Sequence, residues 1–180
     1  MKTLADFRSA LGAVLLVALL FCSGVPRAFA QKSAWRQATD AELAALLPAR
    51  APVEKEHIET EMRTASGITN GKGRFIAGVV LITAGYSADG KYSHYLVVQS
   101  PMRVAGINLP TGQYVFGWER SGEVLSVHVH DALSGKLLGN AEARLIPGKT
   151  RVESLRIWPP SEKPLIQIGR FGIPYELAED

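Results

Sequence analysis

Turn signals recur along most of this chain, and they separate short runs rich in β-branched and aromatic residues. Asn70-Gly71, Asp89-Gly90, Ser121-Gly122 and Pro147-Gly148 are four of these signals, and each dipeptide favours a tight reversal of the backbone. No helical pattern lies between the runs, so the strands have no crossover connections of the kind that parallel pairing needs. The spacing predicts an antiparallel meander of eight or nine strands.

A meander of this kind either closes into a barrel or folds into a β-sandwich, and the sequence leaves both open. Consecutive hairpins need no long crossover and closure hides both sheet edges, which slightly favours the barrel. The dipeptide Asn70-Gly71 predicts a type I′ hairpin turn before the strand expected at residues 74–83. The three prolines within residues 158–164 predict a rigid loop.

One short helix is expected before the strands, in an N-terminal segment that spans residues 31–50. Thr39 can cap the helix and Glu42 can reach back to it in a capping box. Pro48 ends the helix, and leucines at residues 43, 46 and 47 give it one apolar side. The mainly β fold therefore has one short N-terminal helix, and residues 51–180 form a single antiparallel β domain.

The first thirty residues have the pattern of a signal peptide. Lys2 and Arg8 precede an apolar stretch at residues 11–21, and Ala28-Phe29-Ala30 gives the small-x-small pattern of a cleavage site. Cleavage is expected after Ala30, which places the mature protein in the periplasm or outside the cell. The apolar stretch is shorter than the roughly 20 residues of a membrane-spanning helix, so no integral span is expected after cleavage.

The charge of the chain argues against a nucleic-acid partner, and its cysteine usage argues against a disulfide or a thiol nucleophile. The chain has a formal charge of +3, but Lys2, Arg8 and Arg27 against Asp6 account for +2 of it within the leader. The mature chain is therefore close to neutral, no basic patch is evident in the sequence, and no nucleic-acid partner is expected. The single cysteine, Cys22, also lies in the leader, which leaves the mature chain without a disulfide or a thiol nucleophile.

One local motif resembles a pattern in small exported bacterial β-domain proteins of unassigned function. Residues 109–114 read Leu-Pro-Thr-Gly-Gln-Tyr, which is similar to a Leu-Pro-x-Gly-x-Tyr turn that opens a strand in those proteins. A hairpin with a Ser-Gly-Lys turn then follows, as at residues 124–145. The resemblance implies an exported β domain, and it carries no catalytic group.

The sequence His128-Val129-His130 is the pattern that most invites a chemical interpretation. Residues two apart on a strand point to the same face, so both imidazoles could bind one divalent metal ion. Together with Gly122, this spacing is similar to the opening of a cupin metal motif. The match then fails, because residues 131–139 contain no glutamate and no histidine follows His130.

A metal at this position would need further ligands from His57, His94, Glu119 or Asp131. The alternative interpretation is that Val127 and Val129 face the core while His128 and His130 lie on the solvated side of the strand. On that interpretation the protein binds no metal and has no cofactor.

Aromatic side chains give a second candidate site. Tyr95, Tyr114, Phe116 and Trp118 lie on strands that are neighbours in a meander. If they point into a barrel, they could line a cavity for a small apolar ligand; if they fill it, they are core.

Three functions are consistent with these observations. The first is a non-catalytic binding or structural protein of the cell envelope that holds a small apolar ligand or an envelope component. The second is a metal-dependent, cupin-like barrel enzyme that uses His128 and His130. The third is a protein-interaction module that uses an exposed sheet edge. The sequence favours the first over an enzyme and assigns no catalytic residue.

Overall fold

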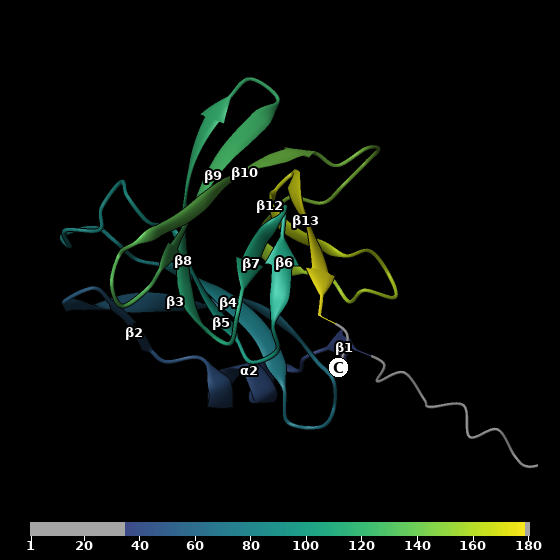
Figure 1. The fold of residues 1–180 in the computed structure, drawn as a ribbon, viewed down its shortest axis with the longest axis horizontal. Coiled ribbons are helices and arrows are strands. Elements are labelled where there is room, and N and C mark those ends of the chain that lie inside the picture. The colour runs from purple at the N-terminus through teal and green to yellow at the C-terminus, as the bar shows by residue number, and fades with distance from the viewer. Residues whose placement is uncertain (1–34, 179–180) are drawn as a thin grey trace, which may run out of the picture. The chain divides into compact units, whose positions relative to one another are not determined.

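The computed structural model of the chain describes residues 35–178 (Figure 1). They belong to the second of two units into which the chain divides, Ser33–Asp180. The expected leader and its cleavage site after Ala30 lie outside the described residues.

Antiparallel strands and one helix build this unit, which confirms the mainly β fold class. The helix is α2 (Asp40–Leu46), and the strands are β1 (Arg36–Gln37), β2 (Arg50–Val53), β3 (Glu56–Thr69), β4 (Phe75–Leu81), β5 (His94–Val98), β6 (Met102–Val104), β7 (Ile107–Leu109), β8 (Gly112–Ser121), β9 (Val124–Asp131), β10 (Leu137–Leu145), β11 (Glu153–Ile157), β12 (Leu165–Gly169) and β13 (Phe171–Leu177). More strands are present than the expected eight or nine because β1, β2, β6 and β7 are too short to show a two-residue alternation.

The strands form one sheet that curls into a nearly closed barrel. Its order is β1-β3-β4-β5-β8-β9-β10-β13-β12-β11, with β2 beside β3 and β6 between β13 and β7. Figure 1 shows β8, β9 and β10 curving from β3, β4 and β5 over to β12 and β13. The two ends of the sheet meet where the Ile157 amide of β11 donates a 2.9 Å hydrogen bond to the Ser66 hydroxyl of β3.

Alternation along the strands produces two apolar cores, one on each side of the wall. Phe116 belongs to the core inside the barrel and Val115 to the core outside it. Leu96 and Tyr95 divide in the same way. The outer core is completed by α2, by β2 and by the segment before β5, through Leu43, Val53 and Tyr92 among others. The wall is therefore buried on both faces here, which explains why β4 is apolar throughout and why β5 is apolar except for the buried His94.

Helix α2 begins at the capping box that the sequence predicts. Glu42 donates its amide to the Thr39 hydroxyl at 3.3 Å, and the Glu42 carboxylate accepts the Thr39 amide at 2.8 Å. The helix ends before Pro48, and Leu43 is its buried residue. The apolar side expected from the sequence packs in the outer core, through Leu43, Leu46 and Leu47.

The turn after β3 lies where Asn70-Gly71 predicts it, but the expected type I′ conformation is wrong. Gly71 has a positive φ of 68°, whereas Asn70 does not have a positive φ. The Asn70 side-chain oxygen instead accepts the amides of Lys72 and Arg74, at 2.8 and 3.1 Å. This side chain organises a longer loop between Thr69 and Phe75 by replacing backbone hydrogen bonds.

A buried histidine joins β5 to the far end of the sheet. His94 is 5% exposed, its Nε2 lies 3.1 Å from the Ser154 carbonyl, and its Nδ1 lies 2.8 Å from the Ser93 hydroxyl. A carbonyl only accepts, so Nε2 carries the hydrogen. Burial lowers the pKa of His94 below its ordinary 6.5, although the bond to Ser154 opposes the shift.

This lowered pKa predicts a loss of stability in acid. The unfolded chain binds a proton at His94 more readily than the folded chain does. The contribution of His94 to the free energy of unfolding is therefore complete above pH 6.5, and it is lost as the pH falls through the pKa of the folded protein. We expect urea unfolding at pH 7.5 and pH 5 to show a smaller difference for His94→Gln than for the wild-type protein. The exposed His57 is the control, and His57→Gln should keep the wild-type difference. If His94→Gln shows the same difference between the two pH values as the wild-type protein, the lowered pKa of His94 is not the cause of the loss of stability in acid.

Candidate functional site

The structure separates the four aromatic residues of the predicted ligand site. Tyr114 and Phe116 are buried in the core inside the barrel, whereas Tyr95 is buried in the core outside it. Trp118, two residues after Phe116, is 40% exposed. Tyr114 also closes the Leu-Pro-x-Gly-x-Tyr motif, since its hydroxyl donates a 2.6 Å hydrogen bond to the Pro110 carbonyl. The four side chains therefore do not line one cavity.

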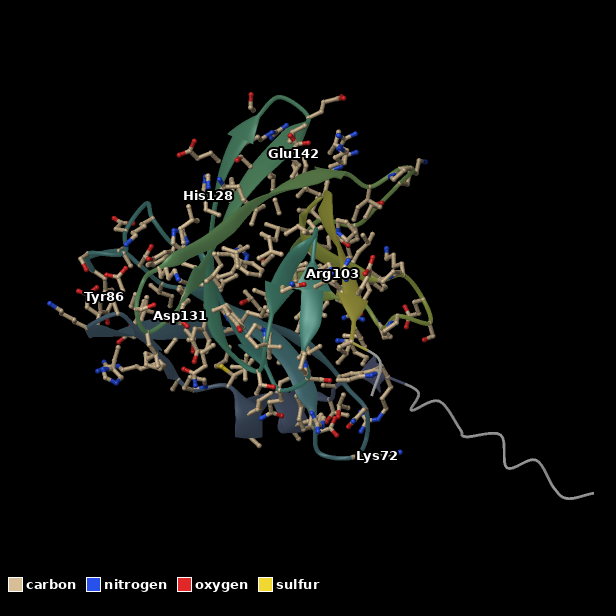
Figure 2. The ribbon with its side chains drawn as sticks, in the orientation of Figure 1. Lys72, Tyr86, Arg103, His128, Asp131 and Glu142 are labelled. Carbon is tan, nitrogen blue, oxygen red and sulfur yellow. The ribbon has the colours of Figure 1, made fainter. Side chains whose placement is uncertain are left out.

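The two histidines of the predicted metal site do lie together, on the outer side of β9. Val127 and Val129 are fully buried inside the barrel, which confirms the alternation expected from the sequence. Figure 2 shows His128 on the outside of the wall. His128 and His130 line a hollow of about 460 Å³ whose other lining residues are Asp89, Gly90, Lys91, Trp118 and Glu119. We call this hollow the outer-wall pocket.

A glycine lets the segment before β5 reach this part of the wall. Gly117 pairs directly with His128 across β8 and β9. A Cβ atom at Gly117 would lie 2.1 Å from the Lys91 carbonyl oxygen, so the backbone at Lys91 packs directly on the backbone of β8. The Ser93 amide then donates a 2.8 Å hydrogen bond to the Phe116 carbonyl. Only glycine permits this approach, which brings Lys91 beside the two histidines.

A hydrogen-bonded network holds Lys91 and Tyr92 in place. The Glu54 carboxylate accepts hydrogen bonds from the Lys91 ammonium at 2.6 Å and from the Tyr92 hydroxyl at 2.7 Å. The bond from Lys91 is the largest cause that lowers the pKa of Glu54. Glu54 is itself fixed by its amide, which donates to the Ala132 carbonyl at 2.7 Å. The charge of Lys91 is thus paired with Glu54 at the surface, where the two side chains are 48% and 37% exposed.

His130 packs against this network. Its ring meets the Tyr92 ring edge to face, with 5.2 Å between the ring centres. Burial, followed by the positive charge of Lys91, lowers the pKa of His130 below 6.5. Its Nδ1 atom is buried and has no hydrogen-bond partner among residues 35–178. Burial and the charge of Lys91 thus both favour the neutral form of His130.

His128 is held differently, at the rim of the pocket. Its Nδ1 lies 2.8 Å from the side-chain oxygen of Asn140, on the neighbouring strand β10. An amide oxygen accepts, so in this arrangement Nδ1 carries the hydrogen and Nε2 offers a lone pair. The pocket thus combines an acceptor at His128 with carboxylates at Asp89 and Glu119.

The further metal ligands that the sequence analysis named are not gathered around the two histidines. Within residues 35–178, no group of three or more His, Cys, Asp or Glu side chains is arranged to hold a metal ion. His94 bonds to β11 at the seam of the barrel, and Asp131 accepts the amide and hydroxyl of Ser134, at 2.8 and 2.6 Å. Of the four named residues, Glu119 alone lines the pocket.

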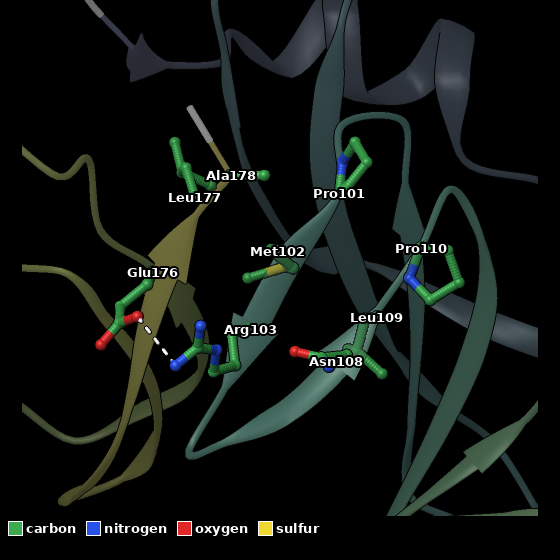
Figure 3. A pocket seen from close by; sticks show the side chains of 9 residues that line it. All are labelled: Pro101, Met102, Arg103, Asn108, Leu109, Pro110, Glu176, Leu177 and Ala178. Carbon is green, nitrogen blue, oxygen red and sulfur yellow. Dashed lines mark ion pairs between the residues drawn. The ribbon is translucent and has the colours of Figure 1, made fainter. Parts of the chain in front are cut away.

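A second hollow lies where β6, β7 and the end of β13 meet (Figure 3). It measures about 270 Å³ and includes Met102, Leu109 and Leu177 in its lining. Its charged side chains, Arg103 and Glu176, form an ion pair with each other at 3.6 Å. This hollow has fewer free polar groups than the outer-wall pocket and is the weaker candidate.

The site residues predicted from the sequence did not include Glu54, Lys91 or Tyr92. Lys91 lines the outer-wall pocket, and Glu54 and Tyr92 contact Lys91. Glu54 and Lys91 are far apart in the chain, and nothing in the sequence pairs them. One signal was available at Gly117, because a glycine inside a strand often marks the close approach of another backbone segment.

Comparison of the sequence with protein-family models, with curated proteins and with solved structures gives no match. Among the described residues, no helix has the length and apolar character to cross a membrane.

Proposed function

We propose that this chain is an exported, non-catalytic binding protein that holds a small polar component of the cell envelope in the outer-wall pocket. The observation that carries the proposal is the convergence of His128 and His130 with Lys91 on one hollow. A ligand site usually combines a formed concavity with a few oriented polar groups. The network of Glu54 and Tyr92 supplies the orientation.

The contents of the barrel support an external site over an internal one. Phe116 and Tyr114 are 1% and 3% exposed and pack among the aliphatic side chains of the inner core. A barrel of about eight strands has an interior that side chains alone can fill. The polar lining of the outer-wall pocket then suits a ligand with hydrogen-bonding groups better than the apolar ligand considered first.

Native mass spectrometry of the protein tests this function. The full chain is expressed with its N-terminal segment, purified without chelators and compared with the double variant His128→Ala/His130→Ala. We expect an organic adduct on the wild-type protein and at least about a tenfold weaker adduct on the variant, since each lost hydrogen bond contributes about 1 kcal/mol. The protein mass also reports whether cleavage follows Ala30.

The control is His57→Ala, which removes an exposed histidine on β3 and should keep the adduct. An adduct of equal strength on the double variant would contradict the proposal, as would a bare protein mass. A divalent metal bound by the wild-type protein and lost in the double variant would favour the metal-dependent enzyme instead.

A further inference from the structure

Basic residues concentrate in the part of the chain that forms β11, β12 and their loops. Residues 144–170 contain six Lys and Arg against two Glu, a net charge of +4. The other residues within 35–178 carry a net charge of −2. No basic patch was expected from the sequence; in the structure, the side chains of Arg156 and Lys163 both lie over the ring of Trp158.

Two of these basic side chains lie over the indole ring of Trp158. The Lys163 ammonium lies 3.7 Å from the centre of the indole ring, and the Arg156 guanidinium carbon lies 5.0 Å from it. The indole N–H donates a 3.1 Å hydrogen bond to the fully buried Gln167. Gln167 in turn donates to the Arg151 carbonyl at 2.7 Å, which fixes the loop before β11 beside the same strands.

The two cations at Trp158 keep their charge available. Neither Arg156 nor Lys163 forms an ion pair within residues 35–178. The Arg156 Nε atom is buried and has no hydrogen-bond acceptor among those residues. A cation–π contact attracts a cation without neutralising it. An anion that reached this face would therefore meet two unpaired positive charges.

The loop segment that Gln167 binds through the Arg151 carbonyl also carries an exposed apolar side chain, Val152. Val152 is 66% exposed and follows Arg151 directly. The loop after β10 and the loop between β11 and β12 both project to the right in Figure 1. Tryptophan, exposed aliphatic groups and surrounding Lys and Arg side chains are the combination found at membrane–water interfaces.

From this arrangement we propose that the face formed by Arg156, Trp158, Lys163 and Val152 docks onto an anionic phospholipid surface. Phosphate groups of the lipids pair with Arg156 and Lys163, and Val152 enters the headgroup region. The exposed Val152 favours a lipid surface over a soluble polyanion or a nucleic acid, since neither of those would bury it. This docking is independent of the outer-wall pocket and uses different residues.

Vesicle co-sedimentation of the full chain tests the docking. We expect binding to phosphatidylcholine vesicles that contain phosphatidylglycerol, and little binding to vesicles of phosphatidylcholine alone. The variant Arg156→Gln/Lys163→Gln should bind the anionic vesicles roughly thirtyfold more weakly, since each basic residue near such a surface contributes about 1 kcal/mol. Val152→Asp, at an exposed position, should also weaken binding without affecting folding.

The matched control is Lys55→Gln/Lys136→Gln, which removes two exposed charges elsewhere and should bind far more strongly than the Arg156 and Lys163 variant. Equal losses in the two double variants would overturn the proposal, because they would indicate a general charge effect. Displacement from vesicles by inorganic phosphate at constant ionic strength would also overturn it and indicate an isolated phosphate site. Binding to duplex DNA but not to vesicles would overturn it as well.

The variant His128→Ala/His130→Ala should keep vesicle binding, so this proposal and the proposed function can fail separately.

Discussion

Replacing Phe116 by alanine should lower the free energy of unfolding by about 4 kcal/mol, the loss typical of a fully buried phenylalanine. Phe116 is 1% exposed and packs in the core inside the barrel. Truncation removes the burial of the ring and leaves a cavity that the surrounding strands cannot collapse to fill, because the barrel wall is held by backbone hydrogen bonds. Urea unfolding at neutral pH measures the difference.

The same strand offers a control. Trp118 is also aromatic but is 40% exposed, so Trp118→Ala should cost much less than Phe116→Ala. The comparison decides between the two roles that the sequence allows for these aromatics. A small loss in Phe116→Ala, together with an apolar molecule that copurifies with the wild-type protein, would show that Phe116 lines a ligand cavity.

The class of fold was predictable because its signals are local. Turn dipeptides such as Asn70-Gly71 mark where the chain reverses, and the alternation of His128 and His130 with Val127 and Val129 shows which side of β9 faces the core. Both signals depend on residues within a few positions of one another. The helix was predictable for the same reason, since Thr39 and Glu42 form its capping box three residues apart.

The site was predictable only in part because its geometry depends on contacts between distant segments. The pairing of Glu54 with Lys91 requires β2, β3 and the segment before β5 to meet, which no local pattern encodes. The basic face around Trp158 was missed for a related reason. Arg156 and Lys163 are seven residues apart in the sequence, and the hairpin of β11 and β12 brings both to one indole ring.

Gly117 connects the wall of the barrel to the outer-wall pocket, and Gly117→Ala should disturb both. The new methyl group would lie 2.1 Å from the Lys91 carbonyl oxygen, and a backbone atom cannot move aside as the end of a flexible side chain can. The segment before β5 must therefore lift from β8. We expect a loss of about 3 kcal/mol in the free energy of unfolding, near the upper end for an added methyl group in a packed site.

The displacement also predicts a change at His130 that a general loss of stability would not produce. Burial and the charge of Lys91 lower the pKa of His130, and lifting the segment that carries Lys91 and Tyr92 weakens both causes. The pKa of His130, followed by NMR titration of the folded protein, should rise toward 6.5. Gly139→Ala is the control, because its methyl group would meet the movable end of the Ile107 side chain at 3.0 Å. If both glycine variants leave the pKa of His130 unchanged, the packing of Lys91 on Gly117 does not shape the pocket.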